Sequence, residues 1–228
     1  EINEYGKYEN IDIGHFHNLV NWDKFTADFT YNTNAIEGSK VGKKEVKKLL
    51  DHIQEPRNYD ETETLNVAKA VDFIKKTKEG FSLNLIKKIH NICFTGTKHF
   101  AGNIREVDVA IRDNQGNIVH RGPPSSYIEP LLKELVDWYN KYKNKYSVLL
   151  IVSVAHNQFE YIHPFQDGNG RVGRLLLNYI LIKHKYPPLN IQLNDRQRYY
   201  RVLQIYSRTG NMKPTLKFFV SQYKKQYM

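Results

Sequence analysis

Apolar residues recur at every third or fourth position along most of the chain, which is the spacing that gives an α-helix one buried face. Such a stripe runs through residues 149–162, and an aromatic stripe of Trp22, Phe25 and Phe29 marks an earlier helix. No internal repeat or linker-like stretch interrupts this pattern. The sequence therefore predicts a mainly α-helical protein, a helical bundle in which residues 1–228 form a single domain.

One segment departs from the helical spacing. Apolar residues alternate there with polar or small ones, as in a half-buried strand: Val107, Asp108, Val109, Ala110 and Ile111. A polar turn over residues 113–117 follows, and the apolar pattern then resumes, which is typical of a β-hairpin over about residues 107–120. Because an isolated hairpin buries little surface, we expect its free edge to serve another partner.

Glycines and charged residues are concentrated in residues 163–174, which read HPFQDGNGRVGR. Pro164 cannot continue the preceding helix, whereas Gly168 and Gly170 let the backbone pass close to a ligand. The apolar stripe that starts at Val172 predicts a new helix directly after the glycines. Free N–H groups and the positive end of a helix dipole attract an anion at such a turn. The segment therefore predicts a phosphate site.

The charged side chains of this segment suit a nucleotide with a metal ion. Arg171 and Arg174 oppose the helix dipole where they stand, and an anion between them would offset that cost. Asp167 precedes the glycine turn, where one carboxylate can share Mg²⁺ with substrate phosphates. His163 has a side chain suited to accepting a proton at neutral pH. Each feature alone also has a structural explanation, such as a helix end or an ordinary turn, but their combination favours a catalytic site.

The segment HPFQDGNGRVGR resembles the motif of the Fic family at every fixed position. The resemblance extends from about Phe25 to about Phe219 and includes the AGNIR run at residues 101–105. It implies the Fic fold, in which a β-hairpin flap lies next to the active site of a helical bundle. It also implies a protein adenylyltransferase, which moves AMP from ATP to a Ser, Thr or Tyr hydroxyl of a target protein.

The resemblance implies a role for each residue of the motif. His163 would deprotonate the target hydroxyl, Asp167 would hold Mg²⁺, and Asn169 would fix the phosphates. Gly168 and Gly170 would form the backbone anion site.

Further nucleotide contacts are implied on both sides of the motif. Arg171 and Arg174 would clamp the triphosphate, and Tyr199 or Tyr200 would lie beside the adenine, with core packing as the alternative for either tyrosine. The flap, residues 107–111, would add an extended target segment as an extra strand.

Residues 33–38, TNAIEG, resemble the inhibitory motif of the same family. Thr33 and Glu37 are one helical turn apart, and Gly38 is suited to ending the helix. A carboxylate is disfavoured at that end of a helix unless a cation compensates it, although many such carboxylates are simply solvated. The resemblance implies that residues 22–38 form an inhibitory helix and that Glu37 makes a bidentate, partly buried ion pair with Arg174.

The 34 Lys and Arg residues outnumber the 24 Asp and Glu residues and give a net charge of +10 at pH 7. This excess attracts anions such as nucleotides or nucleic acid, although a bias of composition explains the scattered lysines equally well.

Two alternatives to AMP transfer remain. One is a Fic enzyme that removes AMP or transfers another phosphate-containing group. The other is a basic nucleic-acid-binding module with an inactive site, which the intact motif argues against.

Other features bear on location and assembly. No apolar run approaches the roughly 18 residues of a membrane span, and residues 1–10 lack the order of a signal peptide. The single cysteine, Cys93, lies in an amphipathic stretch and is expected to be a buried structural thiol. We expect a cytoplasmic protein without a membrane contact. Its oligomeric state stays open, with a homodimer as one alternative.

Overall fold

The computed structural model describes residues 20–112 and 115–227 and is mainly helical, as the sequence predicts. The prediction that residues 1–10 lack a signal peptide, and the start of the predicted polar turn at Asp113 and Asn114, fall outside the described residues. The helices and strands are α1 (Trp22–Ile36), α2 (Lys43–Leu50), α3 (Tyr59–Lys76), α4 (Leu83–Phe94), β1 (Ala110–Arg112), β2 (Ile118–Arg121), α5 (Ile128–Tyr142), α6 (Val148–Ile162), α7 (Asn169–Lys183), α8 (Arg196–Thr209) and α9 (Lys213–Tyr227).

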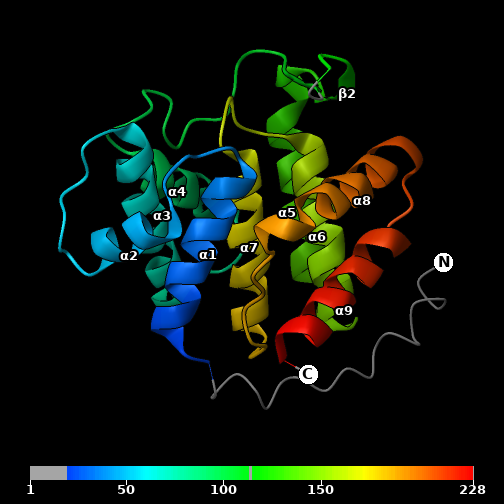
Figure 1. Ribbon diagram of the computed structural model, residues 1–228. Coiled ribbons are helices and arrows are strands. Elements are labelled where there is room, and N and C mark those ends of the chain that lie inside the picture. The colour runs from blue at the N-terminus through cyan, green and yellow to red at the C-terminus, as the bar shows by residue number, and fades with distance from the viewer. Residues whose placement is uncertain (1–19, 113–114, 228) are drawn as a thin grey trace.

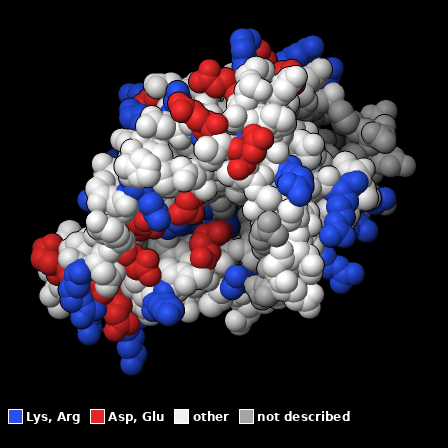
Figure 2. Space-filling view, turned by 90° about the horizontal axis from the view of Figure 1, so that it is seen from above, with Lys and Arg blue, Asp and Glu red and all other residues white. Residues whose placement is uncertain are grey.

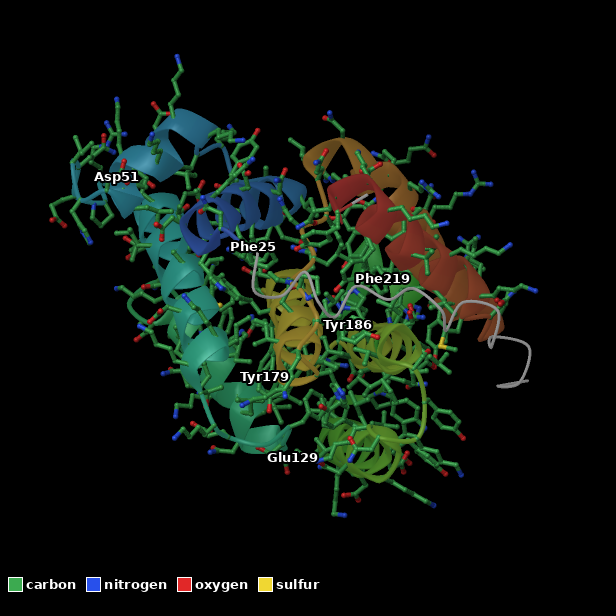
Figure 3. All side chains as sticks on the ribbon, turned by 90° about the horizontal axis from the view of Figure 1, so that it is seen from below. Phe25, Asp51, Glu129, Tyr179, Tyr186 and Phe219 are labelled. Carbon is green, nitrogen blue, oxygen red and sulfur yellow. The ribbon has the colours of Figure 1, made fainter. Side chains whose placement is uncertain are left out.

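Helix α7 is the central element of the bundle (Figure 1), packed between α3 and α4 on one side and α6 on the other. Its apolar stripe is buried, and so are Arg171, Arg174 and Asn178 on its other face. Seen from below, the remaining helices surround α7 (Figure 3), and Phe25, Tyr179 and Phe219 belong to one continuous core. A helix enclosed in this way holds the residues of its first turn in fixed positions.

Helix α1 is part of this core. Phe25, Phe29 and Ile36 are at most 6% exposed and pack in the same cluster as the central helix. The helix is capped at its start by Asn21, ends at Ile36, and is followed by Glu37 as its C-cap. Gly38 then adopts a φ of 93°, a left-handed conformation that favours glycine. The segment predicted as helical over 22–38 is thus helical over 22–36.

The hairpin is shorter than the sequence pattern predicts. β1 and β2 pair antiparallel, with Ala110 opposite Arg121, but Val107, Asp108 and Val109 lie outside the strand. Other groups hold the start of this segment: the Val107 carbonyl accepts a hydrogen bond from Arg105, and the Asp108 carboxylate accepts one from the Ser125 N–H. Alternation along the sequence does not reveal such competing partners.

Cys93 is fully buried, as expected, and burial raises its pKa to about 12, so the thiol stays protonated. Among the described residues, no helix has the length and apolar character required to cross a membrane.

We predict that Phe29→Ala lowers the free energy of unfolding by about 3 kcal/mol, because it leaves a cavity where α1 joins the core. Urea denaturation followed by circular dichroism measures this change. Tyr59→Ala is the control, since Tyr59 is 68% exposed, and it should change stability by less than about 0.5 kcal/mol. A separate early transition for α1 would contradict its place in a single core.

Candidate active site

The turn between α6 and α7 has two residues in the left-handed region, His163 with φ 50° and Gly168 with φ 84°. A side chain at Gly168 would collide with Phe94, because an added Cβ would lie 2.2 Å from the ring. Helix α7 begins at Asn169, one residue after Gly168, so Gly170 lies inside its first turn and not before the helix as the sequence suggests. The first N–H groups of α7 have no partner within the helix and can bind an anion.

Buried side chains hold this turn in shape from behind. The Asn169 side chain accepts a hydrogen bond from the Phe165 N–H and donates one to the Phe165 carbonyl, both at 2.8 Å. His90 accepts from the Gly102 N–H at 2.8 Å and donates to the Asp167 carbonyl at 3.1 Å. Its ring also stacks on Phe165 at 3.8 Å. Asn169 therefore shapes the turn through its amide, and its contact with phosphate stays a prediction.

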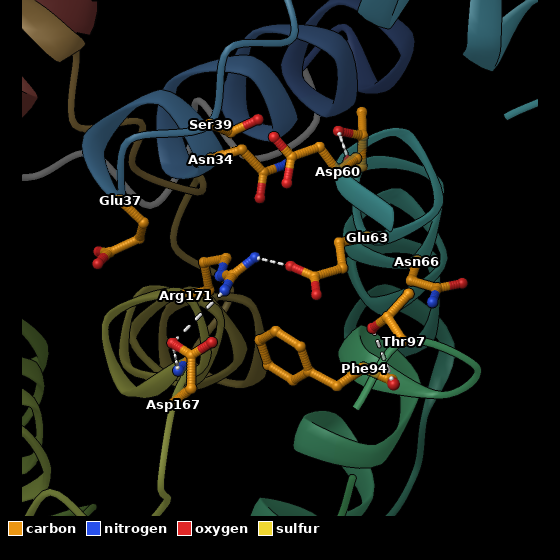
Figure 4. A network of polar contacts seen from close by, with 12 residues as sticks. Asn34, Glu37, Ser39, Asp60, Glu63, Asn66, Phe94, Thr97, Asp167 and Arg171 are labelled. Carbon is orange, nitrogen blue, oxygen red and sulfur yellow. Dashed lines mark hydrogen bonds and ion pairs between the residues drawn. The ribbon is translucent and has the colours of Figure 1, made fainter. Parts of the chain in front are cut away.

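Four side chains of alternating charge contact one another in a closed set that we call the charged ring: Glu63, Lys98, Asp167 and Arg171. Arg171 lies 2.5 Å from Glu63 and 3.8 Å from Asp167 (Figure 4). Lys98 lies 3.2 Å from the other Asp167 oxygen and 3.9 Å from Glu63. Burial raises the pKa of Asp167, but Arg171 and Lys98 lower it more, so its pKa lies below the usual value. Asp167 is thus a carboxylate at neutral pH.

Arg174 is 2% exposed and binds the end of α1. Its Nε donates to the Thr33 hydroxyl at 2.7 Å, and its Nη2 donates to the Thr33 carbonyl at 3.0 Å and to Glu37 at 2.7 Å. Glu37 is joined to Arg174 by one hydrogen bond, from Nη2, so the expected bidentate pair is wrong. Burial alone would lower the pKa of Arg174, but the charge of Glu37 raises it above its usual value.

A cavity of about 380 Å³ opens beside this contact and is lined by His163, Gly170, Arg174, Glu37 and the hairpin. Figure 2 shows a hollow on this face of the molecule where acidic and basic side chains gather. An added Cβ at Gly170 would lie 2.2 Å from Glu37, so a side chain there would force this carboxylate to move. Burial lowers the pKa of His163 to about 4, which leaves a neutral imidazole that can accept a proton at pH 7.

The two tyrosines of α8 face different ways. Tyr199 is fully buried, its hydroxyl lies 2.8 Å from His156, and its ring lies under Arg174. Tyr200 is only partly buried, and its hydroxyl donates to the Ile36 carbonyl at 3.0 Å. Both line the cavity, but the environment of Tyr199 is that of a core residue.

Arg105, the last residue of the AGNIR run, ties the hairpin to the turn. Its guanidinium is completely enclosed and donates to the carbonyls of His163 at 2.7 Å, Val107 at 2.7 Å and Pro123 at 2.6 Å. Both ends of the hairpin and His163 are thus fixed by one side chain. The resemblance of the AGNIR run to the Fic family does not predict which groups Arg105 binds, because the fold brings these groups together from distant parts of the chain.

Two further groups were not predicted from the sequence. His120 of β2 donates to the Tyr161 carbonyl and accepts from the Ser207 hydroxyl, each at 2.8 Å, which holds the hairpin over the cavity. Glu160 lines the same cavity, and burial raises its pKa to about 8, so it is mostly protonated at neutral pH. Nothing in the spacing of these residues along the chain indicates that they meet.

Comparison with known proteins gives one consistent family. Residues 80–181 match the Fic/DOC family. Protein adenylyltransferase fic-1 of Caenorhabditis elegans is 28% identical over 205 residues, which are 83% of this chain and 38% of the relative. Protein adenylyltransferase Fic of Aedes aegypti is 30% identical over 82% of this chain and 38% of its own length. This chain therefore spans about two fifths of the length of these curated relatives.

Solved structures share the fold. A Fic domain containing signaling protein from Bacteroides thetaiotaomicron superposes with a TM-score of 0.81 at 22% identity, covering 98% of this chain and 92% of that protein. BepC of Bartonella tribocorum, solved with bound AMPPNP, superposes with a TM-score of 0.59 at 18% identity, covering 74% and 87%. The helical bundle with its hairpin is thus a known arrangement.

We predict that the His163 ring is neutral down to about pH 5, because burial holds its pKa near 4, below the 6.5 of an exposed histidine. NMR titration of histidine ring signals measures this pKa, with His163→Ala identifying the signal. Since the unfolded chain takes up this proton near pH 6.5 and the folded chain only near pH 4, the residue's contribution to stability is lost as the pH falls between these values. A midpoint near 6.5 would contradict the buried environment.

Proposed function

Because this chain contains a Fic domain, we propose that it is a protein adenylyltransferase that moves AMP from ATP to a Ser, Thr or Tyr hydroxyl of a target protein and is restrained by Glu37. The observation that carries this function is the buried Arg174 near the start of α7. This cation lies beside the turn proposed to bind an anion, and Arg174 now binds Thr33 and Glu37. The curated relatives named protein adenylyltransferase support the same activity.

ATP would bind with its phosphates at the first N–H groups of α7 and its base in the adjoining cavity. Gly168 lets the turn pack against Phe94, and Gly170 would leave the backbone open to the phosphates once Glu37 withdraws. Arg174 would then hold the terminal phosphate. Tyr200, which lines the cavity and is partly buried, is the tyrosine better placed to lie beside the adenine. The bound AMPPNP of BepC supports a nucleotide in a protein of this fold.

Mg²⁺ fits this site as an ion shared with the nucleotide. Among the described residues, no group of three or more His, Cys, Asp or Glu side chains could hold a metal by itself. The turn between α6 and α7, residues 163–168, is called the anion turn below. Its Asp167 offers a charged, 47% exposed carboxylate, and Mg²⁺ usually takes one or two carboxylates together with phosphates and water. When bound there, the ion would neutralise phosphate charge.

The chemistry would be an in-line displacement. The target hydroxyl oxygen bonds to the α-phosphorus of ATP as the bond to pyrophosphate breaks, and the hydroxyl proton passes to the neutral ring of His163. The left-handed backbone at His163 and the Arg105 hydrogen bond to its carbonyl fix the position of the backbone from which the imidazole extends. Catalysis would then consist mostly of positioning and of charge stabilisation by the α7 N–H groups and the arginines.

The target would be presented by the hairpin. Among the described residues, β1 is paired only with β2, so its other edge can add an extended segment by main-chain hydrogen bonds. Ile111 of β1 lines the cavity that also contains His163. A strand added at this edge would bring a hydroxyl side chain toward the imidazole.

A second candidate function is removal of AMP from a modified protein. The observation that favours it is that Glu37, with its side chain 29% exposed, lines the same cavity as His163. A carboxylate there could orient a water molecule toward a bound phosphate. A target protein that carries labelled AMP, isolated and incubated with the enzyme, distinguishes the two reactions. Glu37→Gly should abolish release of the labelled AMP while it raises transfer from ATP.

We predict that Glu37→Gly raises labelling of lysate proteins from α-labelled ATP by about a hundredfold, because misplaced substrate groups alone can cost that factor in rate. Asp51→Gly is a matched control, since Asp51 also caps the C-terminal end of a helix, α2, and it should leave the rate unchanged. Adding Arg174→Ala to Glu37→Gly should abolish the gain, because both changes act on one contact. Equal rates for wild type and Glu37→Gly, with nucleotide bound in both, would refute the restraint. Label from γ-labelled ATP would indicate a kinase.

His163→Ala in the Glu37→Gly background should abolish labelling while ADP binding stays within about threefold, because the imidazole would act on the target hydroxyl and not on the phosphates. Calorimetric titration measures the binding, and gel labelling measures the transfer. A variant that kept most of its transfer rate would exclude His163 as the base.

A further inference from the structure

Lys98 is a cation that contacts Asp167, the carboxylate in the anion turn. It lies in the loop after α4, and its N–H bonds to the Phe94 carbonyl, so the loop continues directly from that buried helix. Its ammonium lies 3.2 Å from an Asp167 oxygen and 3.9 Å from Glu63. The position next to Asp167 is the one that the proposed metal ion would occupy.

The members of the charged ring are held unequally. Arg171 contacts Glu63 at 2.5 Å with both side chains less than 10% exposed, and its guanidinium lies over Phe94 at 4.5 Å. Lys98 has longer contacts and a side chain that is 33% exposed. A lysine ammonium on a flexible stem also changes partners more easily than a guanidinium held by stacking and a short ion pair. Lys98 is thus the ring member most able to turn to a new anion.

We propose that Lys98 is a phosphate-binding residue that makes nucleotide affinity partly independent of Mg²⁺. The inference rests on the proposed function, since it requires a nucleotide at the start of α7. Without metal, the Lys98 ammonium neutralises Asp167 and reaches the phosphates beside it. With metal, Asp167 binds the ion, and the contribution of Lys98 to phosphate binding becomes small.

The electrostatics of the ring support this division. Lys98 and Arg171 balance Asp167 and Glu63, so the ring has no excess positive charge while all four contacts persist. Without Lys98, the carboxylate of Asp167 would face an incoming phosphate with one remaining ion pair, to Arg171 at 3.8 Å, and a hydrogen bond from the Gly168 N–H at 2.6 Å. Phosphate binding without metal would then be opposed by repulsion between like charges.

The test measures ADP binding by calorimetry, in chelator and in excess Mg²⁺, for wild type and Lys98→Gln. ADP is chosen because it lacks the terminal phosphate with which Glu37 would compete. We expect Lys98→Gln to weaken metal-free ADP binding by about tenfold, the scale of one charge-assisted contact, and to weaken binding in Mg²⁺ by less than about threefold. Lys98→Arg should keep most of the metal-free affinity.

Lys133→Gln, which removes an exposed lysine paired with Asp137 on α5, is the control and should change neither affinity. An equal loss in both conditions, or no loss in chelator, would overturn the role of Lys98. So would a wild type that binds ADP only with Mg²⁺. A wild type that binds no ADP under either condition would instead contradict the proposed function itself.

Discussion

The site depends on how a buried guanidinium is satisfied. Arg174 is 2% exposed at the start of the central helix, and a charge at that depth is tolerated only with hydrogen-bonding partners or an ion pair. Thr33 and Glu37 supply these acceptors, and both belong to α1 and its cap. This need explains why the last turn of α1 faces α7, while Phe25, Phe29 and Ile36 hold the helix in the main core.

The anion turn is shaped by contacts with backbone carbonyls and not by its own sequence alone. His90 holds the Asp167 carbonyl, Asn169 holds both polar groups of Phe165, and Arg105 holds the carbonyl of His163. Each of these side chains is buried, and a hydrogen bond is stronger where little water surrounds it. The turn therefore stays in its shape before any ligand arrives, which lowers the cost of binding.

The sequence predicted the parts of the molecule that local physics determines. Helical spacing predicted the bundle, the glycines predicted the turn before α7, and the interval from Thr33 to Glu37 predicted that both face one side of a helix. Partners brought together by the fold were not predictable: nothing near Arg171 in the chain indicates Glu63, 108 positions away. The late start of β1 had the same cause, because Arg105 and Ser125 bind the backbone and side chain that alternation assigned to the strand.

The position of Glu37 has a consequence for how fast a restraint could act. It follows the last turn of α1 and is joined to the buried guanidinium by one oxygen, with a partly exposed side chain. Releasing that oxygen needs a rotation about side-chain bonds, which at exposed positions takes picoseconds to nanoseconds, and it leaves the Thr33 contacts of Arg174 intact. Contact and release would therefore equilibrate far faster than turnover. Basal activity would then report the equilibrium fraction of open molecules, and every 1.4 kcal/mol that favours the closed contact would make that fraction about tenfold smaller.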